Sequence, residues 1–168
     1  MGMCVFKFIG SFTHGKAREG GFSTFEVLTV MALVGIASSM VVPNFLQLNE
    51  RALLKQMTTE LHSNLNMSRM MAMNRNLTVS VGLAMSGGHV TATFTNPSGG
   101  DVMAPMVMRS DITGFGGATL VRFSSLGLRV GGGAGNQSIT LTSRNGLTHE
   151  IQVTPAGKTR WCASACTS

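Results

Sequence analysis

FSTFEVLTVMALVGIASSMVV, residues 22–42, is the stretch that decides the fold, because it contains only one charged side chain, Glu26. As an α-helix rising about 1.5 Å per residue it extends over roughly 32 Å, about the thickness of a membrane's hydrocarbon core. Lys7, Lys16 and Arg18 precede it, and positive charge before an apolar helix keeps that end in the cytoplasm. The pattern predicts a helix that crosses the membrane, with the rest of the chain outside the cytoplasm.

Glu26 lies inside this apolar stretch, where a charged carboxylate is costly unless it is paired. Cleavage after Gly21 would create a new α-amino group on Phe22, and residues 22 and 26 share one face of a helix. We therefore expect the amine to pair with Glu26 of the same chain or of a neighbouring copy. A glutamate near the helix end that reaches back to the membrane surface is the simpler alternative.

The segment GFSTFE, residues 21–26, followed by the apolar run resembles the type IV prepilin motif. That motif is a Gly, then a Phe, then a Glu as the fifth residue of the mature chain. The resemblance implies that a membrane prepilin peptidase cuts between Gly21 and Phe22 and that Phe22 is N-methylated. It also implies that Glu26 helps subunits to dock into a helical filament. Gly35 and Pro43 fall where pilins commonly carry these residues.

The cleavage site leaves one alternative open. A secretory signal peptide would be cut after the apolar run, and Ala37-Ser38-Ser39 could serve as that site. The junction before the run, at Gly20-Gly21, fits the prepilin peptidase better. The leader, residues 1–21, is more apolar than a typical short basic leader, which suggests a start codon further downstream.

Beyond Pro43 the pattern remains helical over residues 44–76. Pro43 itself is expected to bend or loosen the helix, because it removes a backbone hydrogen bond. Apolar side chains then recur at spacings that place them on one face, which predicts an amphipathic helix packed on the head and ending near Asn74: Leu54, Met57, Leu61, Leu65 and Ala72. A group of methionines in the same region is expected to fill the core: Met67, Met70, Met71 and Met73.

From residue 77 the period changes to two, which predicts strands. Residues 77–81 and 89–95, joined by a turn at 86–88, predict a hairpin. Asn145-Gly146 predicts a second tight turn, and further strands are expected at residues 105–109, 119–123, 138–143 and 148–154. The predicted fold class is α+β: a long N-terminal helix, transmembrane over residues 22–43 and amphipathic over 44–76, packed on a small antiparallel β-sheet head, residues 77–168.

Three head segments, residues 60–83, 121–127 and 151–160, resemble in that order the helix end, a middle strand and the closing strand pair of the pseudopilin H and FimT-like minor pilin group. The resemblance implies a subunit held in the inner membrane by a single span, with a periplasmic head, that later joins a filament of other pilins. It implies neither enzyme activity nor a cofactor. Two machines fit, a type IV pilus or a type II secretion system with its short pseudopilus. We favour the minor pilin.

The preference for a minor pilin over a pseudopilin rests on a segment near the C-terminus. FimT-like minor pilins carry a Gly-Arg-x-Arg element that binds DNA, and residues 157–160 here read Gly-Lys-Thr-Arg. Lys158 and Arg160 are therefore the first candidates for contacts to DNA phosphates during DNA binding and uptake. Arg144 and Arg129 join them only if their loops gather at the same end of the sheet. A basic surface that merely solvates the head is the alternative, since the chain has a net charge of +6.

Lys158 and Arg160 alternate along one expected strand, so they should share a face. Trp161 should point the other way and pack against the head. Lys replaces the first Arg of the element, which keeps the charge but loses the two-pronged hydrogen bonding of a guanidinium.

Cysteine usage fits an oxidising compartment. Cys4 lies in the leader, so the mature chain keeps Cys162 and Cys166, which we expect to form a disulfide. Metal binding is not predicted, because no second Cys or His pair has ligand spacing. Residues 157–159 match the end of a P-loop, the phosphate-binding motif of many nucleotide-binding proteins. Because Gln152 stands where that motif requires its first Gly, nucleotide binding is not predicted. The remaining histidines are scattered and are expected to pack or to face solvent: His62, His89 and His149.

Overall fold

The computed structural model describes residues 22–166, without the side chains of residues 39–44. The predicted leader 1–21, with Gly21 of the expected cleavage site and Cys4, lies outside the described residues, as does the side chain of Pro43. The chain divides into two compact units, with the boundary between residues 41 and 42.

One helix, α1 (Thr24–Asn74), contributes to both units. It ends at the predicted residue. Asn76 adopts a positive φ of 50°, and the Leu77 amide then donates to the Ala72 carbonyl at 3.1 Å. This backward bond is typical of a helix that stops in a left-handed turn, and it releases the chain towards the first strand.

In the first unit, every described side chain from residue 22 to residue 38 is exposed. Most of the large ones are apolar, and Phe22, Phe25 and Met31 are among the most exposed. Within the part of the chain that the structure describes, no helix has the combination of length and apolar character that a membrane crossing needs.

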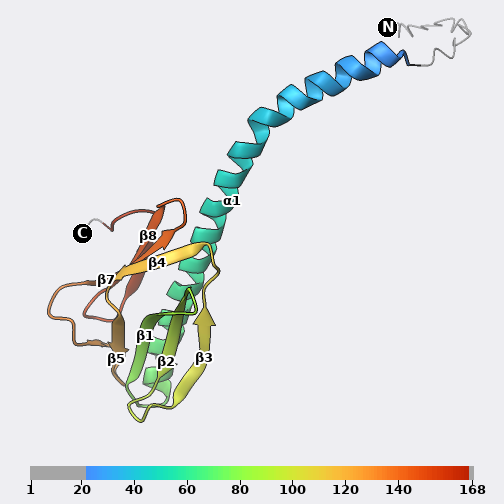
Figure 1. Cartoon of the computed structure of the whole chain (residues 1–168). Helices are drawn as coiled ribbons and strands as arrows, with labels where there is room; N and C mark the ends of the chain where they lie inside the picture. Colours follow the sequence, from blue (N-terminus) through green and yellow to red (C-terminus); the bar gives the residue numbers. More distant parts are fainter. Residues whose placement is uncertain (1–21, 167–168) are drawn as a thin grey trace, which may run out of the picture. The chain divides into compact units, whose positions relative to one another are not determined.

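The second unit holds two antiparallel sheets rather than the single sheet that the sequence suggested (Figure 1). One sheet has the order β3-β2-β1-β5-β6 and the other β4-β7-β8-β9. The strands of the first are β1 (Val79–Ser86), β2 (His89–Thr95), β3 (Asp101–Val107), β5 (Leu120–Phe123) and β6 (Arg129–Val130). Those of the second are β4 (Ile112–Gly117), β7 (Gln137–Ser143), β8 (Thr148–Val153) and β9 (Thr159–Cys162).

The link between β4 and β5 ties the two sheets together. The Ala118 amide donates to the Ser138 carbonyl of β7 at 2.8 Å, and the neighbouring Thr119 carbonyl accepts from the Leu83 amide of β1 at 2.8 Å. Two consecutive residues therefore bond to opposite sheets, and the sheets share one core.

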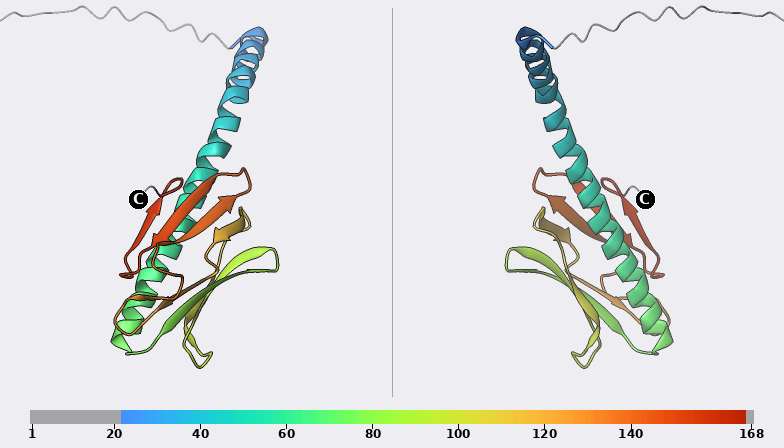
Figure 2. Two further views of the ribbon diagram at one scale, coloured as in Figure 1. Left: turned by 90° about the vertical axis from the view of Figure 1, so that its left-hand side faces the viewer. Right: turned by 90° about the vertical axis from the view of Figure 1, so that its right-hand side faces the viewer.

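The C-terminal half of α1 covers one side of this head (Figure 2). The apolar face predicted from the helical spacing is buried, since Leu61, Leu65 and Ala72 have no exposed surface and Leu54 only 1%. Valines, isoleucines and phenylalanines from both sheets pack against it, among them Val79, Phe94 and Ile151. The predicted α+β architecture, a long N-terminal helix packed on an antiparallel β head, is confirmed.

The methionine prediction is wrong for three of its four residues. Met67, Met70 and Met73 are exposed, and only Met71 packs against the core. Since the first three recur every third residue, they form a stripe that turns away from the buried face.

The strand predictions are correct where turns are well marked. The turn at 86–88 and the Asn145-Gly146 turn both join paired strands, β1–β2 and β7–β8. β3 begins at Asp101, before the predicted residue 105. β4 and β6 were not predicted; the β4 sequence ITGFGG has three glycines and therefore resembles a loop.

Candidate functional site

The start of α1 carries the two residues on which the predicted assembly chemistry depends. The Ser23 carbonyl accepts the first turn's amides, from Glu26 at 2.9 Å and from Val27 at 3.2 Å. Phe22 and Glu26 line the same shallow hollow, of about 270 Å³, whose other walls are apolar. The two residues are therefore close together, although Phe22 precedes the first residue of α1, Thr24. Among the described residues Glu26 has no ion-pair partner.

Arg69, near the C-terminal end of α1, binds two turns of the head. Its guanidinium donates to the Gly127 carbonyl at 2.8 Å and to the Ala156 carbonyl at 3.3 Å. One helix side chain therefore holds both the turn after β5 and the turn between β8 and β9. The second turn closes on itself as well, because the Thr154 amide donates to the Lys158 carbonyl at 2.9 Å.

The basic candidate Lys158 ends this turn and Arg160 lies on β9. They line one hollow of about 480 Å³ together with Asn136, Thr154 and Thr159. Both basic side chains are exposed. The Arg160 guanidinium donates to the Gln152 side-chain oxygen on the neighbouring strand β8, with its Nε at 2.8 Å. The structure therefore brings the two leading candidates together on one face, with Arg160 held in place by its neighbour.

Arg129 lies near the same end of the head but inside it. Its backbone amide donates to the Pro155 carbonyl at 3.1 Å, yet its side chain is only 7% exposed. The guanidinium donates to carbonyls of the glycine-rich loop, those of Gly131, Gly133 and Gly135, at 2.5 to 2.8 Å. Arg129 thus fastens a loop that its composition alone suggests to be flexible, and it does not present its charge to the 480 Å³ hollow.

Arg144 lies at the opposite end of the second sheet. It precedes the β7–β8 turn, and its amide donates to the Asp111 carbonyl at 2.9 Å. The next residue, Asn145, donates to the Glu50 carboxylate of α1. The turn that carries Lys158 instead lies beside Arg69, about five helical turns further along α1. The loops of Arg144 and Lys158 therefore do not gather at one end of the sheet.

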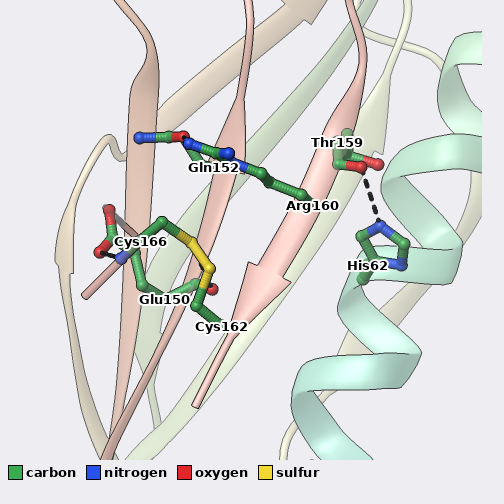
Figure 3. The surroundings of a disulfide bond; sticks show 7 residues. All are labelled: His62, Glu150, Gln152, Thr159, Arg160, Cys162 and Cys166. Carbon is green, nitrogen blue, oxygen red and sulfur yellow. Dashed lines mark hydrogen bonds between the residues drawn. A yellow bond between two sulfur atoms is a disulfide. The ribbon is translucent and has the colours of Figure 1, made fainter. Parts of the chain in front are cut away.

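Cys162 and Cys166 are joined by a disulfide with a Cα–Cα distance of 5.4 Å (Figure 3). The bridge folds the tail after β9 back over β8, where the Cys166 amide donates to the Glu150 carboxylate at 2.7 Å. Figure 3 also shows Thr159 of β9 facing His62 of α1, whose Nε2 lies 3.3 Å from the Thr159 carbonyl oxygen. The edge strand is thereby held between the helix and the rest of its sheet.

Trp161 packs against the core, as predicted, on the face of β9 opposite to Arg160. The His149 ring stacks on it with centroids 5.5 Å apart, and His149 Nδ1 lies 3.2 Å from the Thr58 hydroxyl of α1. Burial and the positive charge of Lys55 lower the pKa of His149 below its ordinary value of 6.5. Within residues 22–166 no group of three or more His, Cys, Asp and Glu side chains is placed to hold a metal ion.

One of the comparisons with known proteins agrees with this architecture. No family model matches the sequence, and no curated protein matches it. Among solved structures, the type IV minor pilin FimU of Pseudomonas aeruginosa strain PAO1 superposes with a TM-score of 0.52. The match covers 66% of this chain and 89% of that one, at 15% sequence identity. The chain therefore has a pilin-like fold.

Proposed function

We propose that this chain is a minor subunit of a type IV pilus, inserted in the inner membrane through residues 22–43 before it assembles. The observation that supports the proposal is a pilin-like head on a chain whose exposed apolar helix begins next to a hollow lined by Phe22 and Glu26. The membrane span and the removal of the leader 1–21 rest on the sequence, which combines the prepilin motif with an apolar run. The head, residues 77–168, then lies in the periplasm and later in the filament with other pilins.

Processing is the first test. Mass spectrometry of the chain purified from membranes should give a mature N-terminus at N-methylated Phe22. A mature terminus beyond Ala37 would instead support a secretory signal peptide and contradict the pilin proposal.

Assembly is the second test. Glu26→Ala should leave membrane insertion intact, because it removes a charge from an apolar segment, but it should impair incorporation into filaments. Thr29→Ala is a matched control, since Thr29 is also exposed and its hydroxyl donates within the helix, to the Phe25 carbonyl at 2.8 Å. Equal incorporation of the two variants would show that Glu26 has no part in docking.

A pilus is favoured over a type II secretion system by the resemblance of residues 157–160 to the FimT-like element. Deletion of the gene should therefore reduce surface pili and leave secretion by the type II pathway unchanged. The reverse pattern would identify the chain as a minor pseudopilin.

We further propose that the head binds DNA through phosphate contacts from Lys158 and Arg160. Both line one hollow, and the Lys158 ammonium has no ion-pair partner in the described part of the chain. So few contacts give weak binding, about micromolar or poorer, which falls steeply with salt. Several copies in one filament would raise the effective affinity.

The test is fluorescence anisotropy with labelled duplex DNA and the full chain in lipid nanodiscs, at a series of salt concentrations. The double variant Lys158→Gln with Arg160→Gln should lose binding at low salt. The control double variant Arg144→Gln with Arg122→Gln removes the same charge elsewhere on the exposed surface and should retain it. If both double variants lose binding equally, the effect is one of net charge and the proposed site is wrong.

A further inference from the structure

A second hollow, on the other face of β9 from Arg160, is not explained by filament assembly or by DNA contacts. It has a volume of about 420 Å³ and lies between α1, the β7–β8 turn and β9. This volume is within the range of small-molecule sites in proteins. Its walls include the side chains of Arg51, Leu54, Lys55, Leu147, His149 and Trp161.

One side of the hollow is apolar. Leu54 is almost completely buried, and Leu147 and Trp161 pack against the core from the β-sheet side. The indole and imidazole rings are fixed relative to one another by their stacking, and the imidazole is fixed to α1 through Thr58. The site is therefore formed before a ligand arrives, and the free energy of binding is not spent on ordering these walls.

The other side is cationic. Arg51 and Lys55 are one helical turn apart on α1, both are exposed, and neither has an ion pair in the described part of the chain. Carboxylates line neighbouring hollows but not this one. Glu50, which accepts from the Asn145 side chain, lines one with Arg51, and Glu60 lines another with Lys55. The hollow thus combines an apolar, aromatic wall with two positive charges that make no ion pair among the described residues.

We propose that this hollow binds a carboxylate attached to a compact apolar group, with the carboxylate between Arg51 and Lys55 and the apolar group against Leu147 and Trp161. A guanidinium and an ammonium supply charge-assisted hydrogen bonds to a carboxylate. The apolar wall favours such a ligand over an inorganic anion, whose hydration it cannot replace. The chemistry is that of the C-terminus of a peptide ending in an apolar residue, or of a short free organic acid.

The sequence supplies the probe for a direct test. Trp161 is the only tryptophan and the chain has no tyrosine, so intrinsic fluorescence reports on this hollow alone. The full chain in lipid nanodiscs is titrated with N-acetyl-leucine, with its uncharged analogue N-acetyl-leucinamide, with hexanoate and with inorganic phosphate. A saturable change is expected with the two acids and not with the amide or phosphate. Tighter binding of N-acetyl-leucine would indicate a peptide C-terminus as the ligand, and tighter binding of hexanoate would indicate a free organic acid.

Substitutions locate the effect. Arg51→Gln and Lys55→Gln should each weaken binding of the acids by about tenfold, the loss expected for a hydrogen bond between charged groups. Lys55→Arg should restore most of it. Arg122→Gln, an exposed arginine of the other sheet, is the matched control and should bind as the wild type does. Thermal unfolding of each variant verifies that it is folded.

Three outcomes would overturn the proposal. An equal response to acid and amide would show that the carboxylate is not recognised. Displacement of the acids by phosphate at equal concentration would show a general anion site. Binding unaffected by both glutamine substitutions would place the carboxylate elsewhere.

Discussion

A Cβ atom on Gly157 would lie 2.0 Å from the carbonyl oxygen of Gly127, closer than folded proteins allow. Gly157 also has a φ of 75°. Arg69 donates to that same Gly127 carbonyl at 2.8 Å, and its Nε would be 3.1 Å from the added atom. The turn after β5, the turn before β9 and the helix therefore meet at a point that has no room for a methyl group.

Gly157→Ala should consequently destabilise the head by more than the cost of a positive φ alone, which is about 1–2 kcal/mol for a residue with a side chain. Gly146→Ala is a closely matched control, because Gly146 has the same φ of 75° but nothing within 4 Å of its would-be Cβ. Urea unfolding of both variants measures the difference. Equal losses of unfolding free energy would mean that the close approach to Gly127 relaxes without cost.

Arg69→Gln should destabilise the head by about 1–3 kcal/mol, since it removes charged hydrogen bonds to two carbonyl groups. Arg75→Gln changes an exposed arginine just beyond the end of the same helix and should have little effect on stability. The two midpoints of thermal unfolding are compared at one pH and salt concentration. If the two variants unfold at the same midpoint, water replaces the hydrogen bonds of Arg69 to the two turns without loss of stability.

The stability of the head should depend on pH through His149. Because burial and then Lys55 lower the pKa of His149 in the folded chain, the unfolded chain binds the proton more tightly. The contribution of neutral His149 is complete above pH 6.5 and is lost as the pH falls below 6.5 through the folded pKa. Unfolding followed across this range should show that loss, and His149→Gln should remove it.

The same titration is visible in the fluorescence of Trp161, because a protonated imidazole stacked on the indole quenches its emission. Emission should fall on acidification with a midpoint below 6.5. Lys55→Gln should move the midpoint upward, since it removes a positive charge that opposes protonation. A midpoint unchanged in that variant would leave burial as the whole cause.

The disulfide should contribute only about 2 kcal/mol, because the loop that it closes is short. Labelling of the periplasmically produced chain with a thiol reagent, under denaturing conditions without a reductant, should find neither Cys162 nor Cys166 reactive. A Cys4→Ser background excludes the leader's thiol from the count. Two reactive thiols would contradict the bridge, and a large loss of stability on reduction would contradict its minor role.

The sequence predicted the helix and most strands correctly, but it predicted less well which side chains pack in the core. The buried face of α1 follows from spacing alone, because a helix places every third or fourth residue on one side. The methionine prediction failed because it rested on residue type rather than on spacing, and Met67, Met70 and Met73 lie on another side of the helix. β4 was missed because its glycines mimic a loop.

Around Lys158 and Arg160, too, the local pattern was predicted and the long-range contacts were not. Alternation placed Lys158 and Arg160 on one face and Trp161 on the other. The burial of Arg129 depends on three carbonyls of a loop that has no helix or strand pattern. Arg69 binds carbonyls 58 and 87 residues away, and local propensity carries no information on contacts at that range.

The contacts between α1 and the last two strands also bear on how the chain folds. Thr58 meets His149 across 91 residues, and Asn66 meets Thr159 across 93. Closing such long loops before any contact is gained slows folding. During synthesis α1 is complete long before β8 and β9 exist, so the part of its buried face that these two strands cover stays exposed while the earlier strands form. The head can therefore reach its native core only after almost the whole chain has been made, and a chaperone that shields this helix face would reduce aggregation in the interval.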